Sequence, residues 1–217
     1  MRTSQVKILL SELEGFEDPD PELEQYITPP EVAADFLNIV RLERDSKRKE
    51  GRKEKALDLG SGTGMITIGL ALFGFQAVGI EKDHGAVETA RGNLERVEDQ
   101  VGKLPVRFLE KDMEEVEQKG DFVVMNPPFG LQEGSNRDKN LDFLEKGFET
   151  AGEVFALLHS SDKKTGETRQ FIKEFGLNRG FEVKLVKTYV IELPDTMEFH
   201  ERSSKEVKTD LYCFSKR

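Results

Sequence analysis

The chain has 217 residues, of which 36% are hydrophobic and 34% charged, and its formal net charge is −10. This length suits one domain with a substantial core, and the acidic charge argues against broad, nonspecific nucleic-acid binding. The single cysteine, Cys213, excludes intrachain disulfides and cysteine-based zinc sites, and the three histidines have no metal-ligand spacing. No apolar run approaches the ~20 residues of a membrane span, and the N-terminus lacks the form of a signal peptide. We expect a cytoplasmic protein without a bound metal.

Two helical patterns open the chain. Residues 3–14 have apolar side chains at helical spacing, and Gly15 follows where a C-cap would lie. After an acidic, proline-bearing connection, a second helix is predicted to begin with Thr28 as its N-cap, Pro29 as its first residue and Glu31 as the reciprocal member of a capping box. The pattern predicts two helices ahead of the main fold.

Strand patterns then alternate with helical patterns as far as the C-terminus. Strands separated by helices of this length are typical of a parallel sheet with right-handed crossovers, whereas the last two strands are joined by a loop and form an antiparallel pair. We expect an α/β fold with helices on both faces of a seven-stranded sheet. It forms a single domain, residues 1–217, made of a helical extension (1–45) and a sheet core (46–217). The predicted strands are 56–60, 76–81, 105–109, 121–126, 153–158, 181–192 and 207–215, and the predicted helices of the core are 64–73, 84–98, 139–151 and 167–178.

The first predicted strand ends in a glycine-rich turn, Gly60-x-Gly62-x-Gly64, and a helix begins at once. Glycines allow a tight turn and the close approach of a ligand to the backbone. The spacing differs from the Gly-x-Gly-x-x-Gly that carries a pyrophosphate at a helix N-terminus. The glycines alone are compatible with binders of NAD, FAD and S-adenosylmethionine.

Three acidic residues near the predicted strand ends discriminate between these cofactors. Asp58 precedes the first glycine of the turn by two residues, where it would repel a pyrophosphate and attract the ammonium of a methionine moiety. Glu81 ends the second strand, where a carboxylate can accept both ribose hydroxyls, and Asp112 is placed to receive an adenine amino group. Each acid alone is compatible with a solvated turn or a helix cap. Together they favour S-adenosylmethionine over NAD.

The apolar strand 121–126 is interrupted by Asn126-Pro127-Pro128-Phe129. Proline fixes φ, lacks an N–H and keeps the preceding residue extended. Asn126 is therefore expected at the carboxyl end of a strand, where open α/β sheets bind ligands. Asn126 Oδ1 and the Pro127 carbonyl can accept the hydrogens of a planar NH2 group, and Phe129 can stack on its ring. Such acceptors would aim the nitrogen lone pair at a methyl donor, which predicts methyl transfer to nitrogen without a titrating general base. A strand followed by a Pro-rich turn is the simpler alternative.

The glycine turn combined with Asn126-Pro127-Pro128-Phe129 resembles the class I S-adenosylmethionine-dependent amino-methyltransferases. Glu24-Gln25-Tyr26-x-Thr28 and the final Val-x-x-Asp-Leu-Tyr-x-Phe strand resemble, more narrowly, the archaeal and eukaryotic adenine-N6 methyltransferases of small-subunit ribosomal RNA, the methyltransferase-like 5 type. The resemblance implies a Rossmann-like sheet and catalytic roles for Asn126, Pro127, Pro128 and Phe129. It places the cofactor contacts at Gln25, Tyr26, Thr28, Asp58, Gly60, Gly62, Thr63, Gly64, Met65, Glu81, Asp112 and Met113.

The same resemblance implies two partners, an RNA substrate and a small zinc-binding activator protein that pairs with an exposed sheet edge in eukaryotic relatives. Strand 105–109 is expected at an edge, and Pro105 at its start fits an edge position. Basic side chains near the predicted strand C-termini can contact phosphates, or are solvated surface charges: Lys163, Lys164, Arg169, Arg202 and Lys205.

Other functions remain open from the residues. Enzymes that methylate a protein glutamine amide use the same Asn-Pro-Pro-aromatic motif, although its aromatic residue is usually Tyr. Guanine-N2 methylation of RNA is another possible enzyme activity. A cofactor-binding scaffold without turnover belongs to a different class, and intact residues 126–129 argue against it. An NAD oxidoreductase fits least, because of Asp58 and the glycine spacing.

Overall fold

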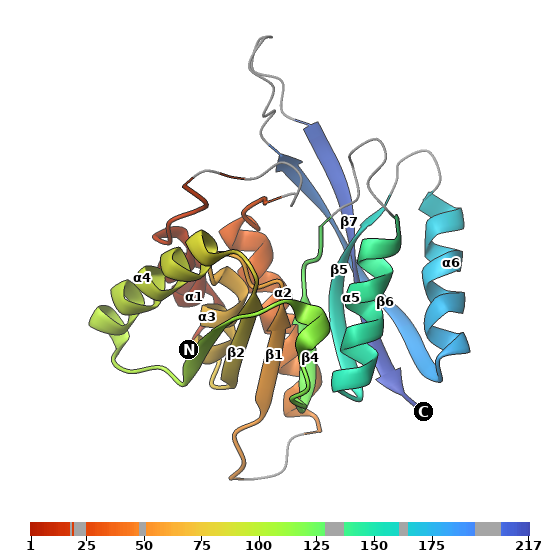
Figure 1. Ribbon diagram of the computed structural model, residues 1–217, viewed down its shortest axis with the longest axis horizontal. Coiled ribbons are helices and arrows are strands. Elements are labelled where there is room, and N and C mark those ends of the chain that lie inside the picture. The colour runs from red at the N-terminus through yellow and green to blue at the C-terminus, as the bar shows by residue number, and fades with distance from the viewer. Residues whose placement is uncertain (18, 20–24, 48–50, 129–136, 161–164, 194–204) are drawn as a thin grey trace.

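The computed structural model describes residues 1–17, 19, 25–47, 51–128, 137–160, 165–193 and 205–217. The described residues form one seven-stranded sheet in the order β3-β2-β1-β4-β5-β7-β6 (Figure 1). Six strands run in the same direction, and β7 is antiparallel to both of its neighbours. The predicted α/β fold, with an antiparallel final pair, is confirmed. The strands are β1 (Lys55–Leu59), β2 (Gln76–Glu81), β3 (Val106–Glu110), β4 (Phe122–Met125), β5 (Glu153–Ser160), β6 (Phe181–Leu193) and β7 (Lys205–Lys216).

Helices cover both faces of the sheet, and each face has its own apolar core. One core is formed with α1, α2, α3 and α4, and the other with α5 and α6. Five buried phenylalanines, Phe36, Phe75, Phe122, Phe155 and Phe214, are among the largest side chains inside. The helices are α1 (Thr3–Ser11), α2 (Pro30–Asp45), α3 (Met65–Leu72), α4 (His84–Val101), α5 (Arg137–Thr150) and α6 (Thr165–Asn178), and a short 3₁₀ helix, η2 (Met113–Glu115), follows β3.

The N-terminal helix boundaries differ from those predicted. Helix α1 ends at Ser11, because the backbone N–H of Glu14 bonds to Asn93 Oδ1 on α4 and does not continue the helix. Helix α2 begins at Pro30 with extended Pro29 as its N-cap, so the prediction of Thr28 as N-cap is wrong. The hydroxyl of Thr28 accepts a hydrogen bond from Asn126.

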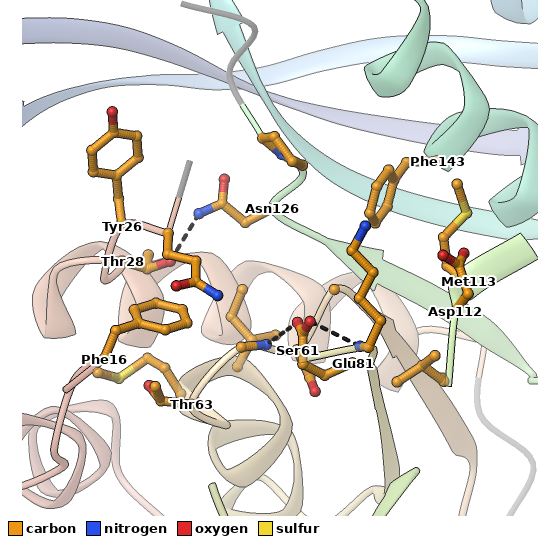
Figure 2. Close-up of a pocket in the computed structure, with 18 of the residues that line it drawn as sticks. Phe16, Tyr26, Thr28, Ser61, Thr63, Glu81, Asp112, Met113, Asn126 and Phe143 are labelled. Atoms are coloured by element: carbon orange, nitrogen blue, oxygen red, sulfur yellow. Dashed lines mark hydrogen bonds between the residues drawn. The ribbon is translucent and has the colours of Figure 1, made fainter. Parts of the chain in front are cut away.

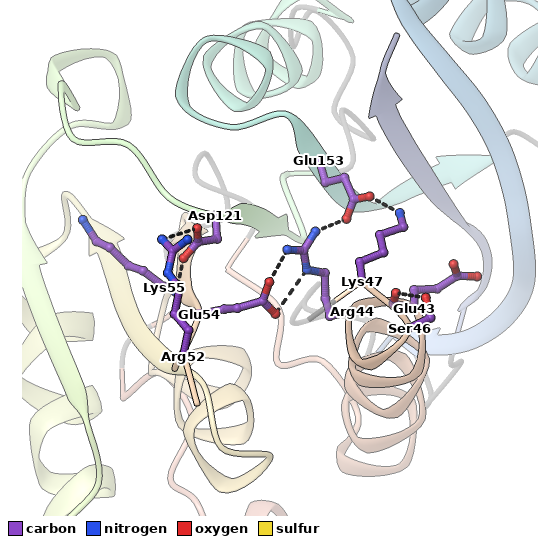
Figure 3. A network of polar contacts seen from close by, with 9 residues as sticks. All are labelled: Glu43, Arg44, Ser46, Lys47, Arg52, Glu54, Lys55, Asp121 and Glu153. Carbon is purple, nitrogen blue, oxygen red and sulfur yellow. Dashed lines mark hydrogen bonds and ion pairs between the residues drawn. The ribbon is translucent and has the colours of Figure 1, made fainter. Parts of the chain in front are cut away.

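A buried charge network fastens the C-terminal end of α2 to the amino ends of the strands (Figure 3). Arg44 pairs with Glu54, just before β1, and with Glu153 at the start of β5, and Lys47 also pairs with Glu153. The Arg44 guanidinium lies 5.1 Å from the centre of the Phe122 ring. This end of α2 is therefore fixed, and its other end lies over the carboxyl edge of the sheet. None of the described helices has the length and apolar character needed to cross a bilayer.

Candidate active site

A pocket of about 230 Å³ opens at the carboxyl ends of β1, β2 and β4 (Figure 2). This is the edge at which open α/β sheets bind their ligands. Five parts of the chain line it: the segment before α2 (Phe16 and residues 25–28), the glycine turn with the start of α3 (residues 60–63, 65 and 66), the ends of β2 and β3 (residues 80–82 and 111–114), the end of β4 (Asn126 and Pro128) and α5 (Asp142 and Phe143).

The glycine turn needs its glycines for both conformation and space. Gly60, Gly62 and Gly64 have φ of 73°, 50° and 89°, in the left-handed region that side chains disfavour. A Cβ on Gly60 would lie 3.0 Å from the Phe143 ring, and one on Gly62 would lie 2.9 Å from the Phe16 ring. The turn is therefore enclosed by two aromatic rings, and its backbone is open to a ligand between them.

The carboxylate of Glu81 is held against this turn. Its Oε2 accepts the N–H of Gly62 at 2.9 Å, and its Oε1 accepts the N–H groups of Lys82 and Asp83 at 2.8 and 3.0 Å. Each oxygen has about two acceptor sites, so Oε1 is fully used and Oε2 can accept one further hydrogen bond. Glu81 thus presents a preoriented acceptor to the pocket, suited to ligand hydroxyl groups.

Asn126 presents a second acceptor, at the end of β4. Its Nδ2 donates to Thr28 Oγ1 at 2.9 Å, whereas its Oδ1 is buried and accepts no hydrogen bond from any described residue. A buried carbonyl without a donor is costly. Because Asn126 lines the pocket, a ligand N–H is a suitable partner for this oxygen.

The structure brings most of the predicted site residues to this one pocket. Those that line it are Gln25, Tyr26, Thr28, Gly60, Gly62, Thr63, Met65, Glu81, Asp112, Met113, Asn126 and Pro128. Phe129, for which stacking is predicted, lies outside the described residues. The described residues contain no cluster of three or more His, Cys, Asp or Glu able to bind a metal.

Three predicted residues are not among the described residues that line the pocket: Asp58, Gly64 and Pro127. Asp58 is fully buried in β1, and its Oδ2 accepts a 2.6 Å hydrogen bond from the Thr67 hydroxyl. Burial raises the pKa of Asp58 to about 7. Gly64 is the N-cap of α3, where a Cβ would lie 2.8 Å from the Phe108 ring. Its requirement for glycine therefore comes from packing against β3 as well as from φ.

Ten pocket residues escaped the sequence analysis: Phe16, Ile27, Ser61, Ile66, Ile80, Lys82, Lys111, Glu114, Asp142 and Phe143. The two lysines adjoin Glu81 and Asp112, so their positions at strand ends were a usable signal. Phe16 lies in a segment without periodicity, and Phe143 is one apolar residue among several on α5. No local pattern distinguishes such residues from ordinary core positions.

The donor and acceptor pattern of this pocket fits S-adenosylmethionine. Hydrogen bonds from hydroxyl and amino groups can be accepted by the carboxylates of Glu81 and Asp112, and by Asn126 Oδ1, which has no donor among the described residues. The Phe16 and Phe143 rings supply apolar surface on either side of the glycine turn. A nucleoside with an amino-acid arm carries hydroxyl donors, amino donors and apolar or aromatic surface.

Comparison with known proteins decides the family. Residues 41–160, which include the glycine turn, Glu81 and Asn126, match the model of the methyltransferase small domain. The chain belongs to this methyltransferase family. It is an S-adenosylmethionine-dependent methyltransferase, and the predicted enzyme class and cofactor are confirmed.

Relatives of this methyltransferase match it over nearly the whole chain. The Drosophila melanogaster protein named rRNA N(6)-adenosine-methyltransferase Mettl5 is 32% identical over 94% of this chain and 92% of its own length. The crystal structure of the Pyrococcus horikoshii protein PH1948 is 31% identical, covers 100% of this chain and 98% of its own, and superposes with a TM-score of 0.83. Magnesium protoporphyrin IX methyltransferase from Synechocystis, solved with bound S-adenosylmethionine, is 16% identical over 92% of this chain and 87% of its own, and shares the fold at a TM-score of 0.57.

Proposed function

We propose that this methyltransferase transfers a methyl group to the N6 amine of an adenine in small-subunit ribosomal RNA. The observation that carries the proposal is the buried Oδ1 of Asn126, which lines the pocket and has no described donor. The names of the relatives support adenine in ribosomal RNA as the substrate. A base in a duplex would have to be flipped out of its stack to reach this position.

The residues at the end of β4 orient the amine. S-adenosylmethionine supplies a methyl group already activated by its sulfonium. The lone pair of an exocyclic amine is delocalised into the base, so the protein must reorient it. Asn126 Oδ1 accepts one hydrogen of the amine and the Pro127 carbonyl accepts the other, which makes the nitrogen more tetrahedral and aims the lone pair. The methylated nitrogen is positively charged and strongly acidic, and it releases its proton to water after the transfer, so no titrating base is required. Phe129 is proposed to stack on the adenine.

The cofactor is proposed to bind through the residues that line the pocket. Glu81 Oε2 accepts a hydrogen bond from the ribose hydroxyls of the cofactor, and Asp112 accepts one from the amino group of the cofactor's adenine. The backbone of the glycine turn allows the ligand close approach. The other proposed contacts are Gln25, Tyr26, Thr28, Thr63, Met65 and Met113. Asp58 is proposed to act indirectly, by bonding to Thr67 on α3, the helix that follows the turn.

A protein glutamine amide and the N2 amine of guanine present the same NH2 chemistry to Asn126. The relatives' names favour adenine over both. The match to a methyltransferase family also argues against a scaffold that binds the cofactor without catalysing a reaction. We place the protein in the cytoplasm, on the basis of its composition.

We also propose a small zinc-binding activator as a partner. Strand β3 lies at one edge of the sheet among the described strands, as predicted, and an edge strand can pair with another chain. If the purified protein alone is stable, monomeric and fully active, this part of the proposal fails. Arg169, considered above for phosphate contact, is engaged in an ion pair with the buried Asp210.

The test is methylation of ribosomal RNA by the wild type and by Asn126→Ala, followed by digestion and separation of the nucleosides. N6-methyladenosine should form with the wild type and be nearly lost in the variant, while calorimetry shows that the cofactor still binds. Asn178→Ala, at an exposed position at the end of α6, is the matched control and should remain active. A methylated guanine, or label in protein that survives ribonuclease, would point to one of the alternatives.

A further inference from the structure

One wall of the cofactor pocket comes from the segment between α1 and α2. Phe16 and Gln25, in this segment, line the pocket. The family model matches only from residue 41 onwards, so this wall lies outside the matched region. Its role in cofactor binding therefore has to be argued from its contacts.

Helix α4 anchors this segment at two points. At the start of the helix, Asp83 Oδ2 accepts a 2.7 Å hydrogen bond from Gln25 Nε2. Further along the helix, Asn93 bonds to the backbone of Glu14. Arg96, one turn beyond Asn93, adds a contact to the Glu14 carboxylate at 2.5 Å. The segment therefore lies along α4 on its way to the pocket.

Asn93 is the centre of this attachment. It is only 1% exposed, so its amide needs partners inside the protein. Its Oδ1 accepts the Glu14 N–H at 2.8 Å, and its Nδ2 donates to the carbonyls of Glu14 at 2.9 Å and Thr63 at 3.0 Å. Thr63 belongs to the glycine turn, and Glu14 is two residues from Phe16. One buried amide thus joins two walls of the pocket.

The Phe16 ring is packed directly against the glycine turn. A Cβ on Gly62 would lie 2.9 Å from its Cζ, so the ring occupies the space beside the turn that a side chain would fill. Figure 2 shows Phe16 between Thr28 and Thr63, on the opposite side of Glu81 from Asp112. Its position beside Thr28, the residue that bonds to Asn126, places it on the Asn126 side of the pocket.

We infer that Phe16 is a binding residue for S-adenosylmethionine, and that Asn93 is the positioning residue that holds its ring against the glycine turn. The ring supplies an apolar wall on the side of the pocket opposite Phe143. The inference deepens the cofactor site on which the proposed function rests, and it does not depend on which substrate is methylated.

The protein contains no tryptophan, which allows a direct test. Phe16→Trp introduces the only tryptophan, at the pocket, and its emission under selective excitation should change as S-adenosylmethionine is titrated. Phe171→Trp, on α6 at a site 49% exposed, is the control and should not respond. An unresponsive Trp at position 16 that coexists with calorimetric binding would overturn the role of Phe16.

Affinity gives the second measurement. Phe16→Ala should weaken S-adenosylmethionine binding by about tenfold, because it removes an aromatic wall. Asn93→Asp keeps the acceptor for Glu14 but turns a carboxylate toward two carbonyls, and it should also weaken binding by about tenfold. Asn178→Asp makes the same charge change at an exposed position and should bind as the wild type does. Unchanged affinity in Phe16→Ala contradicts the inference.

The emission of a Trp at position 16 tests whether Asn93 positions this ring or only stabilises the fold. In the Phe16→Trp background, Asn93→Asp should shift the emission to longer wavelength, since the ring is released toward water. The measurements are made at a temperature where circular dichroism shows the apo variants folded. A lower melting temperature with unchanged emission and cofactor affinity would mean that Asn93 contributes only to the stability of the fold. None of these readouts uses RNA, so failure of ribosomal RNA methylation leaves them interpretable.

Discussion

The side-chain amide of Asn126 donates a 2.9 Å hydrogen bond to the hydroxyl oxygen of Thr28. These residues are 98 positions apart, one at the end of β4 and the other just before α2. The bond occupies Nδ2 and leaves Oδ1 as the group at the pocket. In the proposed mechanism, Thr28 therefore sets which atom of the Asn126 amide the substrate meets.

Replacing Thr28 tests this orientation. Thr28→Val keeps the shape and removes the hydroxyl, and it should lower the methyl-transfer rate by about tenfold or more, because the amide is free to rotate. Thr28→Ser retains the hydroxyl and should recover most of the rate. Single-turnover rates at saturating cofactor, with cofactor affinity measured in parallel, check both variants. Equal rates for Thr28→Val and the wild type would contradict this role.

Gly62→Ala is expected to combine strain with a clash. Its φ of 50° disfavours a side chain by ~1 kcal/mol, and the new Cβ would lie 2.9 Å from Phe16. Gly74→Ala is the matched control, since Gly74 also has a positive φ but has no neighbouring atom within 4 Å of the added Cβ. Both variants should lose stability, and only Gly62→Ala should lose cofactor affinity in calorimetry. A similar cofactor affinity in both variants would show that the Phe16 ring moves aside at little cost.

Asp58 should make stability depend on pH. Burial raises its pKa from 3.8 to about 7, so between about pH 4 and 7 the folded protein keeps a proton that the unfolded chain has released. The contribution of Asp58 is fully present below the unfolded pKa and is lost as the pH rises to the folded pKa. Asp58→Asn should therefore become progressively more stable than the wild type across this range. Melting temperatures of both proteins without cofactor, measured from pH 4 to 8, check this; a constant difference would contradict it.

Arg44→Met should be strongly destabilising. The substitution leaves the carboxylates of Glu54 and Glu153 buried without their guanidinium, and breaking a buried pair in this way costs about 3–5 kcal/mol. Arg91→Met removes an exposed pair with Glu88 and should cost less than about 1 kcal/mol. Urea unfolding measures both free energies. A small cost for Arg44 would mean that the two carboxylates are neutralised in another way.

Strand positions were predicted closely. The expected strand 76–81 coincides with β2, and the expected strand 105–109 differs from β3 by one residue at each end. Buried parallel strands are short apolar runs bounded by turns, so the local pattern identifies them. The edge position expected for strand 105–109 is also confirmed, whereas the order of the other strands was not predicted.

The N-terminal helix ends could not be predicted in the same way. Thr28 has the sequence context of a capping residue, but its hydroxyl is used by Asn126. The backbone N–H of Glu14, which would continue α1, is used by Asn93. In both cases a partner distant in sequence competes with the local hydrogen bond, and no window of neighbouring residues contains that partner.

The pocket residues also fall into those that the sequence identified and those that only the tertiary structure showed. Residues directly after strand ends, such as Glu81, Asp112 and Asn126, were identifiable from the chain alone, because parallel topology brings all carboxyl ends to one edge. Phe16, Phe143 and the orientation of the Asn126 amide depend on how α1, α2 and α5 pack. Asp58 also lies next to a strand end in the sequence, but it is buried within β1, because helices cover both faces of this strand. Local pattern specifies the strand ends; tertiary packing determines which side chains meet across them.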